Sequence, residues 1–280
     1  MQPLPNNLTS HLVTKPSEGF GKGYTKITEA GDKSEGGLDT QMDFGILVHG
    51  PNDPIEETHP KESVWVLIRG EAQISAGDQN QVLKRESIFD EAPTAIHVGP
   101  DTPLSIIPVS EEVEWAITRT TNDKKLTTRI YTPDNLSPEY RGAGLVQNAC
   151  LRNVRLIFDY DTNPEANLVI GEVVNYPGKW SSYPPHHHDQ PEIYHYRFTE
   201  AQGYGHAELG DSVFKVQQND SMIIPPQLDH AQVSAPGYGM WYLWVIRHLE
   251  NNPYTGFEFT ADHAWTLDEG NQGWEPKDDR

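Results

Sequence analysis

The feature that most constrains the fold is a succession of short apolar runs separated by turns. Runs such as 44–49, 64–70 and 240–246 are rich in β-branched and aromatic residues. No window keeps the apolar period of about 3.6 residues that an amphipathic helix requires. The 23 glycines and 22 prolines are spread over 280 residues, so they mark turns rather than low complexity. The chain is therefore predicted to be all-β.

The expected strands form two groups. In the first half they cover 44–49, 64–70, 72–78, 95–98, 104–109, 114–119 and 127–131, with 64–70 and 72–78 as a hairpin that turns after Gly70. In the second half they cover 155–160, 167–175, 193–198, 212–216, 221–225, 231–234 and 240–246. Three segments lack strand alternation: an arm at 1–40 with one strand, a linker at 132–150 with one helical turn, and an irregular tail after 247.

The second group of runs repeats the order of the first. Segment 57–63 falls opposite 186–192, and Leu104 falls opposite His230, at offsets of about 126 to 129 residues. Self-similarity at a fixed offset is typical of a duplicated unit. We therefore expect an arm at 1–40, a first unit at 41–150, and a second unit at 151–280 that includes the tail.

Three consecutive histidines carry the strongest chemical signal. Side chains alternate along an extended strand, so His186 and His188 point to one side and His187 points to the other. Glu192 can face the same side, and His230 arrives later, after a proline turn. Imidazole and carboxylate groups bind divalent first-row metals, and four such ligands leave coordination positions open. The sequence predicts one divalent ion (Zn, Mn or Fe) bound by His186, His188, Glu192 and His230, in preference to histidines on a solvated loop.

The first unit lacks the corresponding ligands. Ser63 stands at the position of the glutamate and Leu104 at that of the last histidine, while His59 is the one remnant. Leucine cannot coordinate a metal. We expect no metal in the first unit.

These motifs resemble the two motifs of the cupins. The cupin pattern of Gly, HxH, Glu and Gly, followed by Pro-x-Gly-x-x-His, is matched by Gly178, His186, His188, Glu192, Gly203, Pro225, Gln227 and His230. Gln227 departs from the usual glycine. The resemblance implies a bicupin, in which two jelly-roll-type β-barrels are related by internal duplication and the C-terminal barrel bears the metal.

A more specific resemblance covers most of residues 60–268. The chain is similar to the 5-deoxy-glucuronate isomerases of myo-inositol catabolism at 178–186 (GKWSSYPPH), 192–198, 202–205, 235–238, 262–265 and 87–90. It departs from that family at His187, His195, Gln227 and Ala231, and in a shorter loop between Asp189 and Glu192. The resemblance implies an aldose–ketose isomerase that converts 5-deoxy-D-glucuronate to 2-deoxy-5-keto-D-gluconate through a metal-stabilised enediolate.

Four further side chains are candidates for catalytic roles. Tyr194 and Tyr196 share the face of Glu192, where they either line the pocket or belong to the core. Arg197 and Lys179 are candidates for binding a substrate carboxylate. On a regular strand Arg197 faces away from the metal, which favours a structural role. The sequence does not identify the general base.

Two other classes of function fit the same ligands. A cupin dioxygenase that uses Fe(II) also has histidine and glutamate ligands, and oxygen consumption would distinguish it. A non-catalytic sugar-binding cupin would bind a ligand and form no product.

Charge and composition restrict the partners. The net charge of −20, from 21 basic and 41 acidic residues, repels nucleic-acid phosphates. No apolar run approaches 18 residues and no secretory signal is evident, so a membrane partner is not expected. The single cysteine, Cys150, suits the cytoplasm. The expected partner is a small-molecule sugar acid, and a homo-oligomer is left open.

Overall fold

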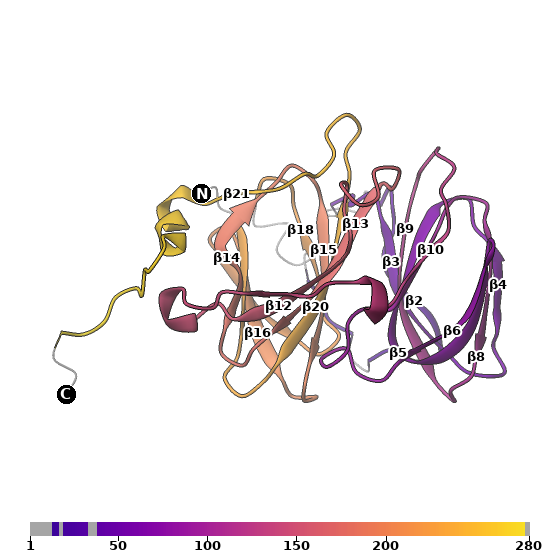
Figure 1. Ribbon diagram of the computed structural model, residues 1–280, viewed down its shortest axis with the longest axis horizontal. Coiled ribbons are helices and arrows are strands. Elements are labelled where there is room, and N and C mark those ends of the chain that lie inside the picture. Colours follow the sequence, from indigo (N-terminus) through magenta and orange to yellow (C-terminus); the bar gives the residue numbers. More distant parts are fainter. Residues whose placement is uncertain (1–12, 17–18, 33–37, 278–280) are drawn as a thin grey trace.

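The computed structural model describes residues 13–16, 19–32 and 38–277, and almost all its regular structure is β (Figure 1). The prediction of an all-β chain is confirmed. The first half contributes β2 (Gly23–Thr28), β3 (Asp43–His49), β4 (Ile55–Thr58), β5 (Glu62–Ala76), β6 (Gln79–Arg85), β7 (Ala95–Val98), β8 (Pro103–Pro108), β9 (Val113–Thr120) and β10 (Arg129–Tyr131).

The remaining strands belong to the second half, apart from one at the start of the chain. They are β1 (Val13–Thr14), β11 (Glu139–Arg141), β12 (Arg152–Phe158), β13 (Leu168–Asn175), β14 (Trp180–His187), β15 (Glu192–Phe198), β16 (Tyr204–Leu209), β17 (Ser212–Gln217), β18 (Ser221–Ile224), β19 (His230–Ser234), β20 (Met240–Arg247) and β21 (Glu258–Phe259). Three 3₁₀ helices, η1 (Pro133–Asn135), η2 (Val146–Asn148) and η3 (Ala261–Leu267), lie in the expected linker and tail.

The two halves share one strand order. A sheet of the first half runs β10-β7-β5-β9-β3-β2, and a sheet of the second runs β1-β18-β15-β20-β13-β12-β11. Within them β7-β5-β9-β3-β2 corresponds to β18-β15-β20-β13-β12. Ser63 pairs with Val98 just as Glu192 pairs with Ile224. The internal duplication is confirmed, and Ser63 occupies the place of Glu192.

The expected hairpin at Gly70 is wrong. β5 continues through Gly70 as one long strand, and the reversal comes after Ala76, into β6. Gly70 has a φ of 108°, and the register of β5 against β9 shifts between Leu67 and Arg69. The positive φ and the register shift bend the strand, so that it pairs with β7 and β9 before the bend and with β6 and β8 after it.

The arm contributes more strand than expected. β2 pairs with β3 in the first half, whereas β1 pairs with β18 in the second half. The chain therefore crosses between the halves before residue 23. Residues 1–12, 17–18 and 33–37 of the expected arm lie outside the described residues.

The two halves pack through the outer faces of their larger sheets. Phe44, Val66, Leu168, Trp241 and Val245 are among the fully buried side chains of the shared core. Figure 1 shows the halves side by side, with β3 and β9 of the first half toward β13 and β15 of the second. The inner faces of both large sheets therefore point away from this junction.

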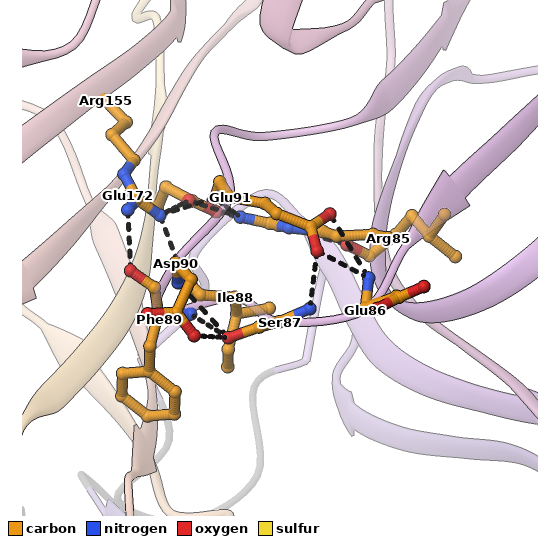
Figure 2. Close-up of polar contacts among 10 residues, drawn as sticks. Arg85, Glu86, Ser87, Ile88, Phe89, Asp90, Glu91, Arg155 and Glu172 are labelled. Carbon is orange, nitrogen blue, oxygen red and sulfur yellow. Dashed lines mark hydrogen bonds and ion pairs between the residues drawn. The ribbon is translucent and has the colours of Figure 1, made fainter.

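A buried ion network also joins the halves (Figure 2). The Arg85 side chain donates to both carboxylate oxygens of Glu172, and Arg155 donates to one of them. The two arginines also donate to backbone carbonyls of the loop 88–91. Because Arg85 and this loop come from the first half and Arg155 and Glu172 from the second, the network fixes one half against the other.

The interior of the first half is filled by apolar side chains. Leu104 is buried there with Trp65, Ile74, Trp115 and others. Leu104 pairs with Glu57, as His230 pairs with His186 in the second half. The position of His230, a candidate metal ligand in the second half, thus corresponds to Leu104 in the apolar core of the first half. No helix among the described residues has the length and apolar character needed to cross a bilayer.

Candidate metal centre and its cavity

Three buried side chains converge in the second half. Glu192 begins β15, His188 directly follows β14, and His230 begins β19. A ligand atom of each lies within 4.8 Å of the others. Glu192 Oε2 is 3.2 Å from His188 Nε2 and 3.4 Å from His230 Nε2. Metal–ligand bonds of about 2.0–2.2 Å place neighbouring ligand atoms roughly 3.0–3.5 Å apart, so these separations suit a shared ion.

The hydrogen bonds of His230 fix the ring for metal binding. Its Nδ1 lies 3.0 Å from the Leu228 carbonyl, to which only a protonated nitrogen can donate. In the neutral ring this leaves a lone pair on Nε2, which is buried without a hydrogen-bond partner among the described residues. Hydrogen bonds from the ring nitrogen that does not bind the metal orient metal-binding histidines. The buried lone pair on His230 Nε2 faces the Glu192 carboxylate, and a divalent cation bound between these two groups would satisfy both.

The charge of the cluster also suits a cation. Burial by itself would raise the pKa of Glu192, but the neighbouring His188 and His230 rings outweigh burial and hold that pKa at about 2. Glu192 is therefore ionised. Burial and the nearby His230 lower the pKa of His186 to about 3, so His186 is neutral. Metal binding requires these protonation states.

The other two histidines differ in orientation. His186 lines the cavity beside the cluster, with its ring centroid 4.4 Å from that of His230. Its Nδ1 faces the Ser182 carbonyl at 3.3 Å, and its ligand atoms do not join the three that converge. His187 points away from the cluster and contacts Asp229 at 2.7 Å. His186 as the fourth ligand remains a prediction.

The cluster opens into a cavity of about 380 Å³. Its floor is the inner face of the large sheet, and its other walls come from β14, the linker and the tail. Tyr194 lies in the floor, 6.0 Å from the His230 ring between centroids, and its hydroxyl is 3.3 Å from Ser182 Oγ. Apolar contacts dominate the walls, which include Val154, Val173, Trp244, Ile246, Phe257 and Leu267.

Three cavity residues were missed by the sequence analysis. Arg141 and Arg152 come from β11 and β12, and the Tyr254 ring lies 5.0 Å from that of His188. No local motif marks these positions. The sheet order, which places β12 beside β13 and β11 beside β12, brings the arginines to the cavity.

The structure does not place Tyr196, Arg197 or Lys179 at the cavity. Tyr196 does share the face of Glu192, but it is fully buried between the sheets, where its hydroxyl donates to Gln232 Oε1. Of the two alternatives, it is a core residue.

The two expected cationic groups do not line the cavity either. Arg197 faces the first half, where it pairs with Glu114 and donates to His195. The alternation of β15 sets this direction, and it supports the structural role. Lys179 lies in the turn before β14, outside the cavity.

Comparison with known proteins decides the family. The sequence pattern of the KduI/IolB family matches residues 12–266. The chain belongs to this family. The 5-deoxy-glucuronate isomerase of Bacillus licheniformis is 27% identical over 285 residues, covering 92% of this chain and 99% of that protein. The family resemblance inferred from the sequence is confirmed.

Solved structures support the fold. An IolB-like protein from Salmonella typhimurium superposes with a TM-score of 0.77 at 21% identity, covering 91% of this chain and 98% of that one. The oxalate decarboxylase of Lactobacillus farciminis superposes with a TM-score of 0.63 at 14% identity, over 89% of this chain and 88% of the other. At these identities the likeness shows the fold alone, and it confirms the prediction of a cupin.

Proposed function

We propose that this protein isomerises 5-deoxy-D-glucuronate to 2-deoxy-5-keto-D-gluconate. The observation that carries the proposal is the convergence of His188, Glu192 and His230 beside a largely apolar cavity, in a chain whose relatives include 5-deoxy-glucuronate isomerases. The cavity lies at the lower end of the volume range typical of small-molecule sites.

The cavity residues have different roles in the proposed reaction. His188, Glu192 and His230, with His186 beside them, would hold one divalent ion. A bound ion supplies Lewis-acid stabilisation of the negative charge that develops when the carbon next to the carbonyl loses its proton. The Tyr194 hydroxyl, positioned by Ser182, can donate a hydrogen bond to a substrate oxygen. The apolar walls exclude water from the reacting carbons.

We also propose that the two units have different roles. The metal belongs to the unit at 151–280, while the unit at 41–150 supports it without binding metal. We also propose that the protein acts in the cytoplasm, in keeping with a single buried cysteine.

An NMR assay tests the activity. Purified protein with its metal is incubated with 5-deoxy-D-glucuronate under nitrogen, and the aldehyde proton signal is followed. We expect it to disappear as the ketone forms, without oxygen. Turnover that requires oxygen would support the dioxygenase instead, and binding without any product would support the sugar-binding protein.

A further inference from the structure

We infer that Arg152 is the group that recognises the carboxylate of the substrate. This inference rests on the proposed function, because it assigns the acidic end of the substrate to one side chain of the same cavity. Arg152 touches substrate in this view but takes no part in the proton transfer.

Arg152 differs from the buried arginines in lacking a carboxylate partner among the described residues. Each fully buried arginine of the described chain has a carboxylate: Arg85 and Arg155 share Glu172, and Arg197 pairs with Glu114. Arg152 lines the cavity and forms no ion pair with any described carboxylate. Its one hydrogen bond among these residues runs from Nη1 to the Cys150 carbonyl.

The surroundings of the Arg152 guanidinium favour an anionic ligand. Arginine carries five N–H donors, and most of those of Arg152 are left for a ligand. Burial lowers the pKa of Arg152, and the nearby Tyr242 and Cys150 partly offset that effect. Val154 and Val173 beside it are apolar. A cation in such surroundings is destabilised until an anion pairs with it, and the planar fork of arginine suits a carboxylate.

Arg152 and the metal cluster line the same cavity. The sheet order β15-β20-β13-β12 places Glu192 and Arg152 on the outer strands of the cavity floor. Tyr194 and Tyr242 lie on β15 and β20, and both are close enough to Arg152 to act on its charge. A sugar acid has its carbonyl at one end and its carboxylate at the other. Arg152, His188 and Glu192 all line the cavity that such a ligand would occupy.

Arg141 is a weaker candidate for the same role. It lies at the cavity on β11, but its Nε and Nη2 both donate to Glu139, which neutralises its charge. The other lysines and arginines that the structure describes do not line the cavity. Arg152 is therefore the cation that an acidic ligand meets.

Steady-state kinetics of variants provide the test. The substrates are 5-deoxy-D-glucuronate and its neutral analogue with a hydroxymethyl group in place of the carboxylate. We expect Arg152→Met to raise KM for the acid roughly 10- to 100-fold, the range for a lost charged hydrogen bond. Activity on the neutral analogue should not fall. Arg152→Lys should restore part of the affinity, because it keeps the charge but not the fork. Arg129→Met, which removes an exposed arginine, is the matched control.

A binding measurement separates this inference from the proposed function. D-glucuronate and D-glucose are titrated calorimetrically into the metal-loaded wild type and the Arg152→Met variant. Selective loss of glucuronate binding in the variant would support the inference even if the wild type isomerised nothing. If Arg152→Met weakened binding and turnover of the acidic and neutral compounds equally, or altered neither, the inference would be overturned, although the isomerase activity could stand.

Discussion

Replacing Glu172 with glutamine should destabilise the junction between the halves strongly without changing the active site. Glutamine keeps the shape of the side chain but removes the negative charge that Arg85 and Arg155 share (Figure 2). The side chains of these arginines are 0% and 5% exposed, so water cannot take the place of the carboxylate. Removing one partner from a buried ion network costs about 3–5 kcal/mol. For a protein of this size, the melting temperature should fall by roughly 10 °C.

Urea denaturation and calorimetry measure the effect. Glu86→Gln, which removes one member of an exposed pair with Lys84, is the matched control and should leave the free energy of unfolding unchanged. The isomerisation rate at 25 °C should stay at the wild-type value, because Val173 lines the cavity whereas Glu172 faces the first half. If Glu172→Gln proved as stable as Glu86→Gln, the reasoning about the buried network would be refuted.

The other predictions concern the metal and the response to pH. His230→Ala should lose most of its metal and its activity, with little change in melting temperature. His187→Lys should keep its metal and its activity. Metal retained by His230→Ala, or lost from His187→Lys, would contradict the assignment of the metal ligands. Elemental analysis of the wild type should find about one divalent ion per chain, and a second ion near Leu104 would contradict a metal-free first unit. Burial, followed by the charge of Arg197, holds the pKa of His195 well below its usual value. The unfolded chain therefore binds the extra proton, and stability should fall as the pH drops below about 6.5, by up to about 1.4 kcal/mol per pH unit. His195→Gln should reduce the slope of unfolding free energy against pH, and an unchanged slope would rule out this cause.

The sequence pattern correctly predicted the features that depend on strand alternation and on the repeat between the halves. The alternation of an extended strand correctly separated His187 from its two neighbours, and the offset between the halves correctly placed Ser63 opposite Glu192. Both results depend on the period of two along a strand and on a conserved strand order. Neither requires knowledge of how distant segments pack.

The sequence-based predictions were wrong or incomplete where the structure depends on which distant strands pair. Gly70 carries the same local signal in a bent strand as in a hairpin turn, and only the partners of β5 distinguish the two. Tyr196 was placed on the correct face, but the side chains that cover it come from other strands. Arg152 could not be singled out from the sequence, because three strand pairings are needed to place β12 in the same sheet as β15.

The first strand gives the duplicated protein an interlocked architecture. β1 closes the sheet edge beside β18, and the Arg197 guanidinium lies 5.4 Å from the ring centroid of Phe20, before the chain enters the first half at β2. A gene fragment that began in the linker would encode every candidate metal ligand but would leave the β18 edge unpaired. Exposed edges recruit other strands, so we expect such a fragment to self-associate. Neither repeat is therefore a self-contained stretch of the chain, because the strand that completes the second repeat precedes the first.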